Sequence, residues 1–143
     1  MGKWLCIVGI LVFVILGVVS PTRAADIAET QKLAVANCAE WLKLVDRGDF
    51  SGSWQNSSSY FRSLVPEDKW TATIESVRKP LGAVTGRKLQ SVTHMSSMPG
   101  APDGEYFVIV YDTSFEHKAT ATETVTPMLD KDGSWLVAGY YIK

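Results

Sequence analysis

The stretch EYFVIVYDTSFEHKATATETVTPML, residues 105–129, decides the fold of this chain. It contains two runs rich in Val, Thr and Tyr, Glu105–Phe115 and Lys118–Leu129, with a tight turn near Glu116-His117 between them. These residue types favour strands, and so short a connection joins antiparallel neighbours. The stretch therefore predicts a β-hairpin.

Two further strands are predicted on either side of this hairpin, over Val84–Met95 and Ser134–Ile142. Two segments separate them, Pro99–Gly104 and Asp130–Gly133. The first contains proline, which fixes φ, and both contain glycine, which supplies positive φ. Because all the connections are short, we expect a four-strand antiparallel meander.

Upstream of the strands the apolar residues repeat at helical spacing. The first predicted helix covers Asp26–Arg47 and opens with a capping box at Asp26. A second covers Phe50–Arg62, and a third begins at Pro66 and ends near Pro80. Helices followed by strands predict an α+β domain whose helices pack on one face of the sheet.

The N-terminus has the order of a secretory signal peptide: a charge at Lys3, an apolar run over residues 4–19, and small residues up to Ala24. We therefore expect cleavage after Ala24, a single α+β domain over residues 25–143, a periplasmic or secreted location, and no contact with the membrane afterwards. The alternative is a membrane anchor formed by residues 4–19. This run is shorter than the roughly 18–20 residues that cross a bilayer.

Composition narrows the chemistry further. The chain has 143 residues and a formal net charge of −1, and no Lys/Arg stripe predicts a nucleic-acid partner. Cys38 is the only cysteine after Ala25, so we expect no internal disulfide. We expect Cys38 itself to be a small residue of the hydrophobic core. His94 and His117 fall at opposite ends of the predicted sheet, so no metal site is expected. The sequence contains no nucleotide-binding motif and no motif of a nucleophilic serine, so we expect no cofactor.

The predicted second strand is apolar on both of its faces. Phe107, Ile109 and Tyr111 share one face, while Val108 and Val110 share the other. A sheet packed on one side alternates more cleanly. Either a second subunit covers the outer face, which predicts a homodimer through the sheet, or a strongly curved sheet wraps part of its own core.

A series of short segments runs from Trp41 to Tyr141: Trp41-Leu42, Val45–Gly48, Ser53-Trp54, Arg78–Gly82 with Arg87, Pro99–Tyr106, Thr113–Phe115, Glu123–Val125, Asp132-Gly133 with Trp135, and Gly139–Tyr141. In their order and spacing they resemble an exported family catalogued as domain of unknown function 4019, and the resemblance extends over nearly all of the chain after the signal peptide. The family implies a cystatin-like, cone-shaped fold similar to nuclear transport factor 2 and ketosteroid isomerase, with helices lining the concave face of a curved sheet. It implies no activity.

Glu123 is the most informative polar residue. Alternation along its strand places this carboxylate on the same side as Ala121 and Val125, which is the inward side. A buried carboxylate costs several kcal/mol unless it is paired or protonated. Glu123 is therefore either a general acid/base or ligand anchor, or a structural group neutralised by an arginine. Arg78 is the first choice of partner and Arg87 the second.

Aromatic side chains give a further set of candidate binding residues, of which Trp54, Tyr106 and Tyr141 are the main ones; the full set is Trp54, Tyr106, Tyr111, Trp135, Tyr140 and Tyr141. They either line a cavity between helices and sheet or pack in the core. A hydroxyl from Tyr106 or Tyr141 near Glu123 would resemble the tyrosine-plus-carboxylate pairing of isomerases with this fold. That comparison is an analogy of fold.

These observations favour a non-enzymatic exported domain that binds a small apolar or amphipathic ligand, or a protein partner. The alternative is a small acid/base enzyme of the isomerase or dehydratase kind, in which Glu123 transfers the proton and a tyrosine polarises the substrate. A third interpretation is a structural envelope protein that docks through its sheet and exposes a large apolar patch.

Overall fold

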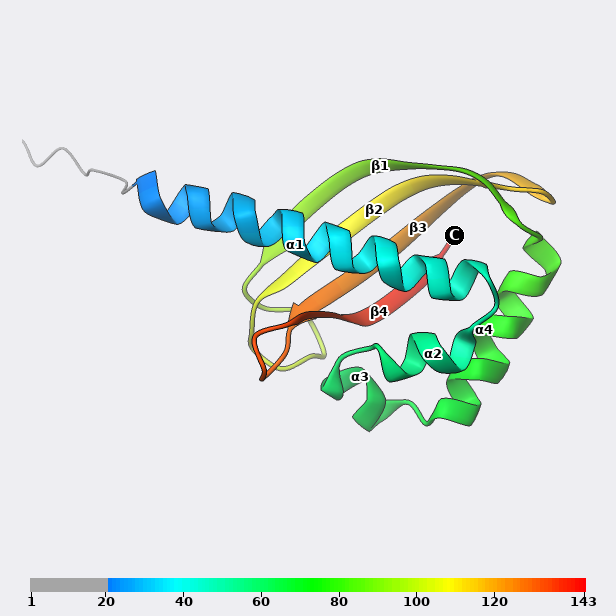
Figure 1. The fold of residues 1–143 in the computed structure, drawn as a ribbon, viewed down its shortest axis with the longest axis horizontal. Coiled ribbons are helices and arrows are strands. Elements are labelled where there is room, and N and C mark those ends of the chain that lie inside the picture. Colours follow the sequence, from blue (N-terminus) through cyan, green and yellow to red (C-terminus); the bar gives the residue numbers. More distant parts are fainter. Residues whose placement is uncertain (1–20) are drawn as a thin grey trace, which may run out of the picture.

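The structure, a computed structural model, describes residues 21–143, with side chains from Ala24 onward; residues 1–20 of the predicted signal peptide lie outside the described range. Helices come first and strands follow, as predicted (Figure 1). The elements are α1 (Pro21–Asp46), α2 (Phe50–Gln55), α3 (Ser59–Leu64), α4 (Glu67–Leu81), β1 (Val84–Met95), β2 (Tyr106–Phe115), β3 (Lys118–Leu129) and β4 (Trp135–Ile142).

The strands form one antiparallel sheet in the order β1-β2-β3-β4, which confirms the meander. Tyr111 of β2 pairs with Glu123 of β3, and Phe115 pairs with Lys118 across the turn. Between β3 and β4 the register shifts, because Pro127 pairs with Val137 whereas Thr126 pairs with Gly139. The extra residue on β4 is a β-bulge, and it changes which side chains point inward beyond it.

Two helix predictions were wrong in detail. The capping box at Asp26 does not start α1, which already begins at Pro21, and the Asp26 carbonyl accepts a bond from Thr30 Oγ1 at 2.9 Å. The predicted helix over Phe50–Arg62 is divided into α2 and α3. Ser58 causes this break, since its backbone is extended and its hydroxyl accepts from the Phe61 N–H at 3.1 Å, which caps α3.

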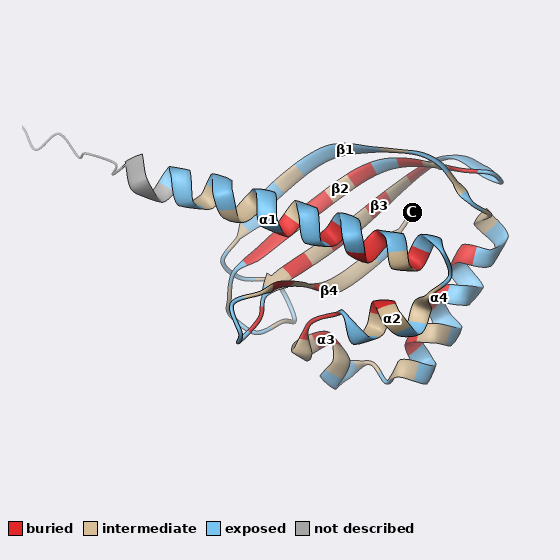
Figure 2. Cartoon of the chain, in the orientation of Figure 1, coloured by how far each residue is buried: buried red, intermediate tan, exposed pale blue. Residues whose placement is uncertain are grey.

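The helices lie on the concave face of the arched sheet, with α1 running along it and α2 packed beside α4 (Figure 1). The first turns of α1 extend past the sheet and are largely exposed, and burial begins at Ala34 (Figure 2). From there Cys38, Trp41 and Val45 face the core, which they form with buried strand residues such as Ile109. At the other end of the helical layer, α4 stops at Gly82, whose φ is +77° and where a Cβ would lie 2.6 Å from the Glu116 carboxylate.

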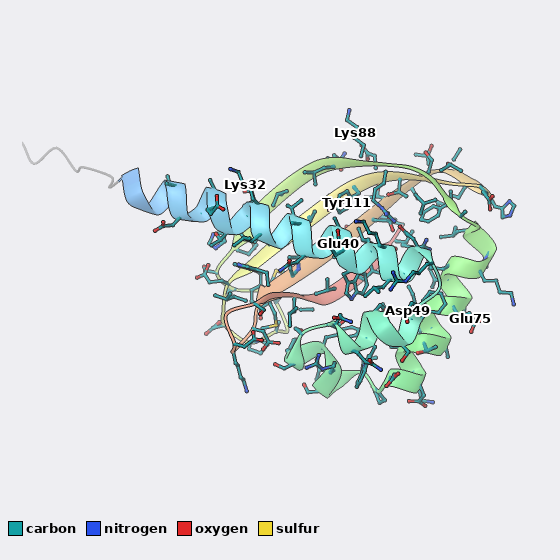
Figure 3. All side chains as sticks on the ribbon, in the orientation of Figure 1. Lys32, Glu40, Asp49, Glu75, Lys88 and Tyr111 are labelled. Atoms are coloured by element: carbon teal, nitrogen blue, oxygen red, sulfur yellow. The ribbon has the colours of Figure 1, made fainter. Side chains whose placement is uncertain are left out.

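β2 is covered unequally on its two faces. Phe107, Ile109 and Tyr111 are buried against the helices, whereas Val108 and Val110 on the outer face are half-buried. No helix of the described residues lies over that outer face (Figure 1), and Lys88 of β1 projects from it away from α1 (Figure 3). Within residues 21–143 no helix has the length and apolar character needed to span a membrane.

Candidate functional site

The carboxylate of Glu123 lies at the centre of a buried hydrogen-bonded network. Its side chain is 0% exposed, as the alternation along β3 predicts. Oε2 accepts from Arg87 Nε at 2.6 Å and from Thr113 Oγ1 at 2.5 Å. Oε1 accepts from Arg87 Nη2 at 3.2 Å and from the Tyr140 hydroxyl. Both oxygens are thus satisfied by protein donors.

Asp46, at the end of α1, supplies a second carboxylate to the same network. It accepts from Arg78 Nη2 at 2.9 Å, and from Arg87 through Nη1 at 2.8 Å and Nη2 at 3.0 Å. Arg78 Nη1 also donates to the Tyr140 hydroxyl at 3.4 Å. Two carboxylates face two guanidinium groups, so the charges balance, and the network joins α1, α4 and all four strands.

The network shifts the proton affinity of its members in directions that follow from these contacts. Burial alone would raise the pKa of Asp46, but the hydrogen bonds from Arg87 and Arg78 outweigh it, and the pKa lies below its usual range. Burial would lower the pKa of Arg87, yet Asp46 and Glu123 raise it. For Tyr140, burial and the charge of Glu123 both raise the pKa, so its hydroxyl stays a proton donor to Glu123.

Arg87 is the direct partner of Glu123, so the first-choice pairing with Arg78 was wrong. Arg78, from α4, is 6% exposed and forms an ion pair with Asp46. Its guanidinium carbon lies 5.1 Å from the centre of the Phe115 ring. Arg87 reaches Glu123 along the inward face of the sheet, past Thr113, with which it pairs in the β1–β2 register.

The predicted tyrosines do not approach Glu123, and Tyr140 takes the place expected for them. Tyr106 donates its hydroxyl to the Pro102 carbonyl at 2.6 Å, and Tyr141 is 57% exposed. The β-bulge between Val137 and Gly139 explains the error, because one extra residue turns Tyr140 inward and Tyr141 outward.

The remaining candidates lie apart from this network. Trp54 is half-buried and donates its indole N–H to the Val65 carbonyl at 2.7 Å, so it joins α2 to the segment before α4. His94 bonds to the neighbouring Glu105, and His117 lies in the turn after β2. Among residues 21–143 no cluster of His, Cys, Asp and Glu has the arrangement of a metal site.

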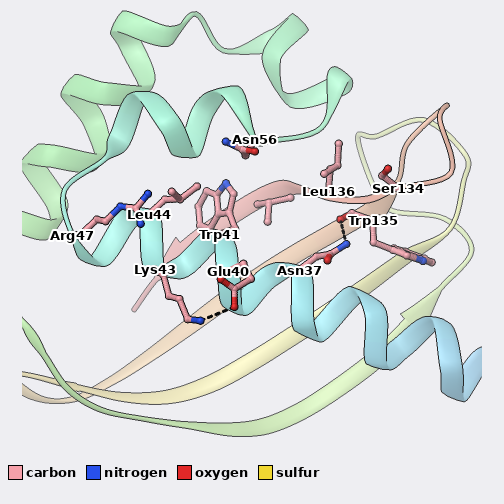
Figure 4. A pocket seen from close by; sticks show the side chains of 11 residues that line it. Asn37, Glu40, Trp41, Lys43, Leu44, Arg47, Asn56, Ser134, Trp135 and Leu136 are labelled. Atoms are coloured by element: carbon pink, nitrogen blue, oxygen red, sulfur yellow. Dashed lines mark hydrogen bonds and ion pairs between the residues drawn. The ribbon is translucent and has the colours of Figure 1, made fainter.

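A cavity of about 470 Å³ opens between α1 and β4, beside the link from α2 to α3 (Figure 4). Its lining combines apolar and polar side chains from α1 and β4. Of its lining residues, only Trp135 was among the aromatic side chains that the sequence suggested for a cavity, because the lining comes from three separate segments and carries no motif. The lining residues are Asn37, Glu40, Trp41, Lys43, Leu44, Arg47, Asn56, Ser134, Trp135, Leu136 and Val137.

The backbone edge of β4 beside this cavity is already occupied. Asn37 Nδ2 donates to the Trp135 carbonyl at 3.1 Å, and the Ser58 N–H donates to the Val137 carbonyl at 2.8 Å. A molecule in the cavity would therefore meet mainly side chains, and it would not add a strand to the sheet at these carbonyls.

Comparison with known proteins gives one match. No curated protein and no solved structure matches the chain, so the likeness to nuclear transport factor 2 stays a prediction. A family model described as "Protein of unknown function (DUF4019)" matches residues 37–140. This range includes both the Glu123 network and the residues that line the α1–β4 cavity. Since the match covers most of the chain, the protein belongs to this family of unknown function.

Proposed function

We propose that this protein is a non-enzymatic exported domain that binds a small amphipathic ligand in the α1–β4 cavity. Leu44, Leu136 and Val137 give the cavity an apolar side. Asn37, Asn56 and Ser134 supply neutral polar groups. This combination is typical of small-molecule sites, in which apolar walls provide affinity and a few polar groups fix orientation.

The observation that carries the proposal is the contrast between this open cavity and the closed carboxylate of Glu123. An acid/base enzyme needs a carboxylate that a substrate can reach. Glu123 is 0% exposed, and Arg87, Thr113 and Tyr140 occupy both of its oxygens. We therefore assign Glu123 a structural role and place ligand binding elsewhere.

We also propose that two copies associate through the outer face of the sheet. Its middle rows, Ser91–Val110–Thr124–Tyr141 and Thr93–Val108–Thr126–Gly139 in the strand register, contain no charged residue. Two such faces related by a two-fold axis meet without burying like charges. The charged residues Lys88 and Asp112 lie opposite one another in the strand register, at one end of the face.

Native mass spectrometry of the protein recovered from its exported compartment tests both proposals. We expect a dimer that carries a removable extra mass. Leu136→Asp should abolish this adduct because it places a charge in the cavity. Leu64→Asp is the matched control, since Leu64 is 62% exposed on α3 and does not line the cavity. An adduct that survives Leu136→Asp but is lost in Glu123→Gln, with the variant still folded, would favour the enzyme.

A further inference from the structure

The charged side chains around the α1–β4 cavity are not distributed evenly. Glu40 and Lys43 pair with each other at 2.6 Å on the side of α1 turned away from Asn56 (Figure 4). Arg47 lies at one end of the cavity, beside Leu44 (Figure 4). Of the three charged residues that line the cavity, Arg47 is therefore the one whose ion-pair partner, Asp49, does not line it.

Arg47 keeps most of its hydrogen-bonding capacity. Its side chain is 63% exposed, and one nitrogen, Nη2, contacts Asp49 Oδ2 at 3.2 Å. Asp49 is itself held in place, because its other oxygen accepts from the Gly52 N–H at 2.9 Å and caps α2. A guanidinium has five N–H donors in a planar fork that matches a carboxylate, so Arg47 can bind a second anion while Asp49 orients it.

The rest of the cavity is neutral and runs along α1. Asn37, Trp41 and Leu44 follow one face of α1, and Arg47 stands in the turn directly after it, so the lining spans about 15 Å at 1.5 Å per residue. Leu136 and Val137 line the side formed by β4, and Ser134 lies at the end away from Arg47 (Figure 4). The cavity therefore offers free guanidinium N–H donors at one end and a long part without net charge.

From this arrangement we infer that the ligand of the α1–β4 cavity is an anionic amphiphile. Its carboxylate or similar group binds Arg47, and its apolar chain lies along Leu44 and Leu136. This inference rests on the proposed function, because it specifies the ligand class of the same cavity. It excludes cationic amphiphiles, whose head group would meet Arg47 with like charge.

Isothermal titration with three probes that differ in head group tests the inference: decanoate, decanol and decyltrimethylammonium, each below its aggregation concentration. We expect decanoate to bind most tightly and decyltrimethylammonium least. Arg47→Gln should weaken decanoate binding about fivefold, since an exposed ion pair contributes modestly, and should leave decanol binding unchanged. Lys32→Gln is the matched control: Lys32 lies on the same helix, is paired with Glu29 at 3.8 Å and does not line the cavity, so this substitution should change none of the three.

The outcomes separate the two proposals. If all three probes bind equally and Arg47→Gln has no effect, the anionic ligand class is wrong while the cavity remains a binding site. If none of the three binds the exported protein after its native ligand has been removed, both proposals fail. If Lys32→Gln weakens decanoate binding as much as Arg47→Gln does, the effect comes from net charge and the assignment to Arg47 is overturned.

Discussion

Tyr111 has a hydroxyl group with no hydrogen-bond partner although the residue is only 6% exposed. It lies between the sheet and α1 (Figure 3), and burial raises its pKa to about 12. A buried polar group that loses its bonds to water without replacing them lowers stability. The site is thus a position where a polar atom opposes folding.

Tyr111→Phe should therefore stabilise the protein by about 1 kcal/mol, because it removes the unpartnered hydroxyl and keeps the ring. Urea unfolding followed by tryptophan fluorescence measures the change. The same substitution at Tyr140 is the control and should lower stability, since that hydroxyl donates to Glu123 and accepts from Arg78. A loss of stability in Tyr111→Phe would mean that the hydroxyl has a favourable contact.

Glu123→Gln should destabilise the fold by about 3 kcal/mol, because it leaves the Arg87 guanidinium partly buried with half of its counter-charge gone. Thermal unfolding at pH 7 measures this loss. Glu75→Gln, on the exposed side of α4, should change the midpoint little. An unchanged midpoint in Glu123→Gln would contradict the structural role of the network.

Between elements, Asp46 is the group that connects α1 to α4 and β1. Its pKa is lowered in the folded state by Arg87 and Arg78, so folding favours the ionised form. This contribution is complete above the unfolded pKa of about 3.9 and is lost as the pH falls through the lower folded value. Acid should therefore loosen the contact of α1 with α4 and β1.

Asp46→Asn tests this linkage. The variant should be less stable by about 2 kcal/mol at pH 7, and its stability should fall less steeply than that of the wild type below about pH 4. Denaturant titrations at a series of pH values from 7 to 2.5 give both quantities. Parallel pH profiles for the two proteins would show that other carboxylates account for the acid sensitivity.

The elements also show where sequence patterns suffice. The four strands could be predicted because runs of Val, Thr and Tyr alternate with short polar turns, two of which contain Gly, and local chemistry determines both. The side chains around Glu123 could be predicted only in part. The inward direction of Glu123 follows from alternation, but Tyr140 replaces Tyr141 because of a bulge that no residue type announces.

The choice between Arg78 and Arg87 failed for a different reason. Both arginines border apolar faces, and the partner depends on how α1 ends against α4, which places Asp46 within 2.9 Å of Arg78. The α1–β4 cavity depends in the same way on tertiary packing. Distances between residues that are far apart in the sequence cannot be read from local residue patterns.

For the molecule as a whole, the uncovered outer face of the sheet leads to a prediction about assembly. Val110 lies in the uncharged middle of this face, paired with Ser91 and Thr124. Val110→Glu should convert the expected dimer into a monomer, because two like charges would meet near the two-fold axis. Sedimentation equilibrium measures the mass. Thr85→Glu, at the exposed start of β1, is the control and should leave the dimer intact.

The buried thiol of Cys38 can report how often the first helix opens. It lies in the core beneath α1 with 0% exposure, and burial raises its pKa to about 12, so almost no reactive thiolate exists in the closed molecule. Alkylating reagents can modify it only in molecules whose first helix has lifted from the sheet. After removal of residues 1–24 no other thiol competes. The alkylation rate therefore measures how often α1 opens.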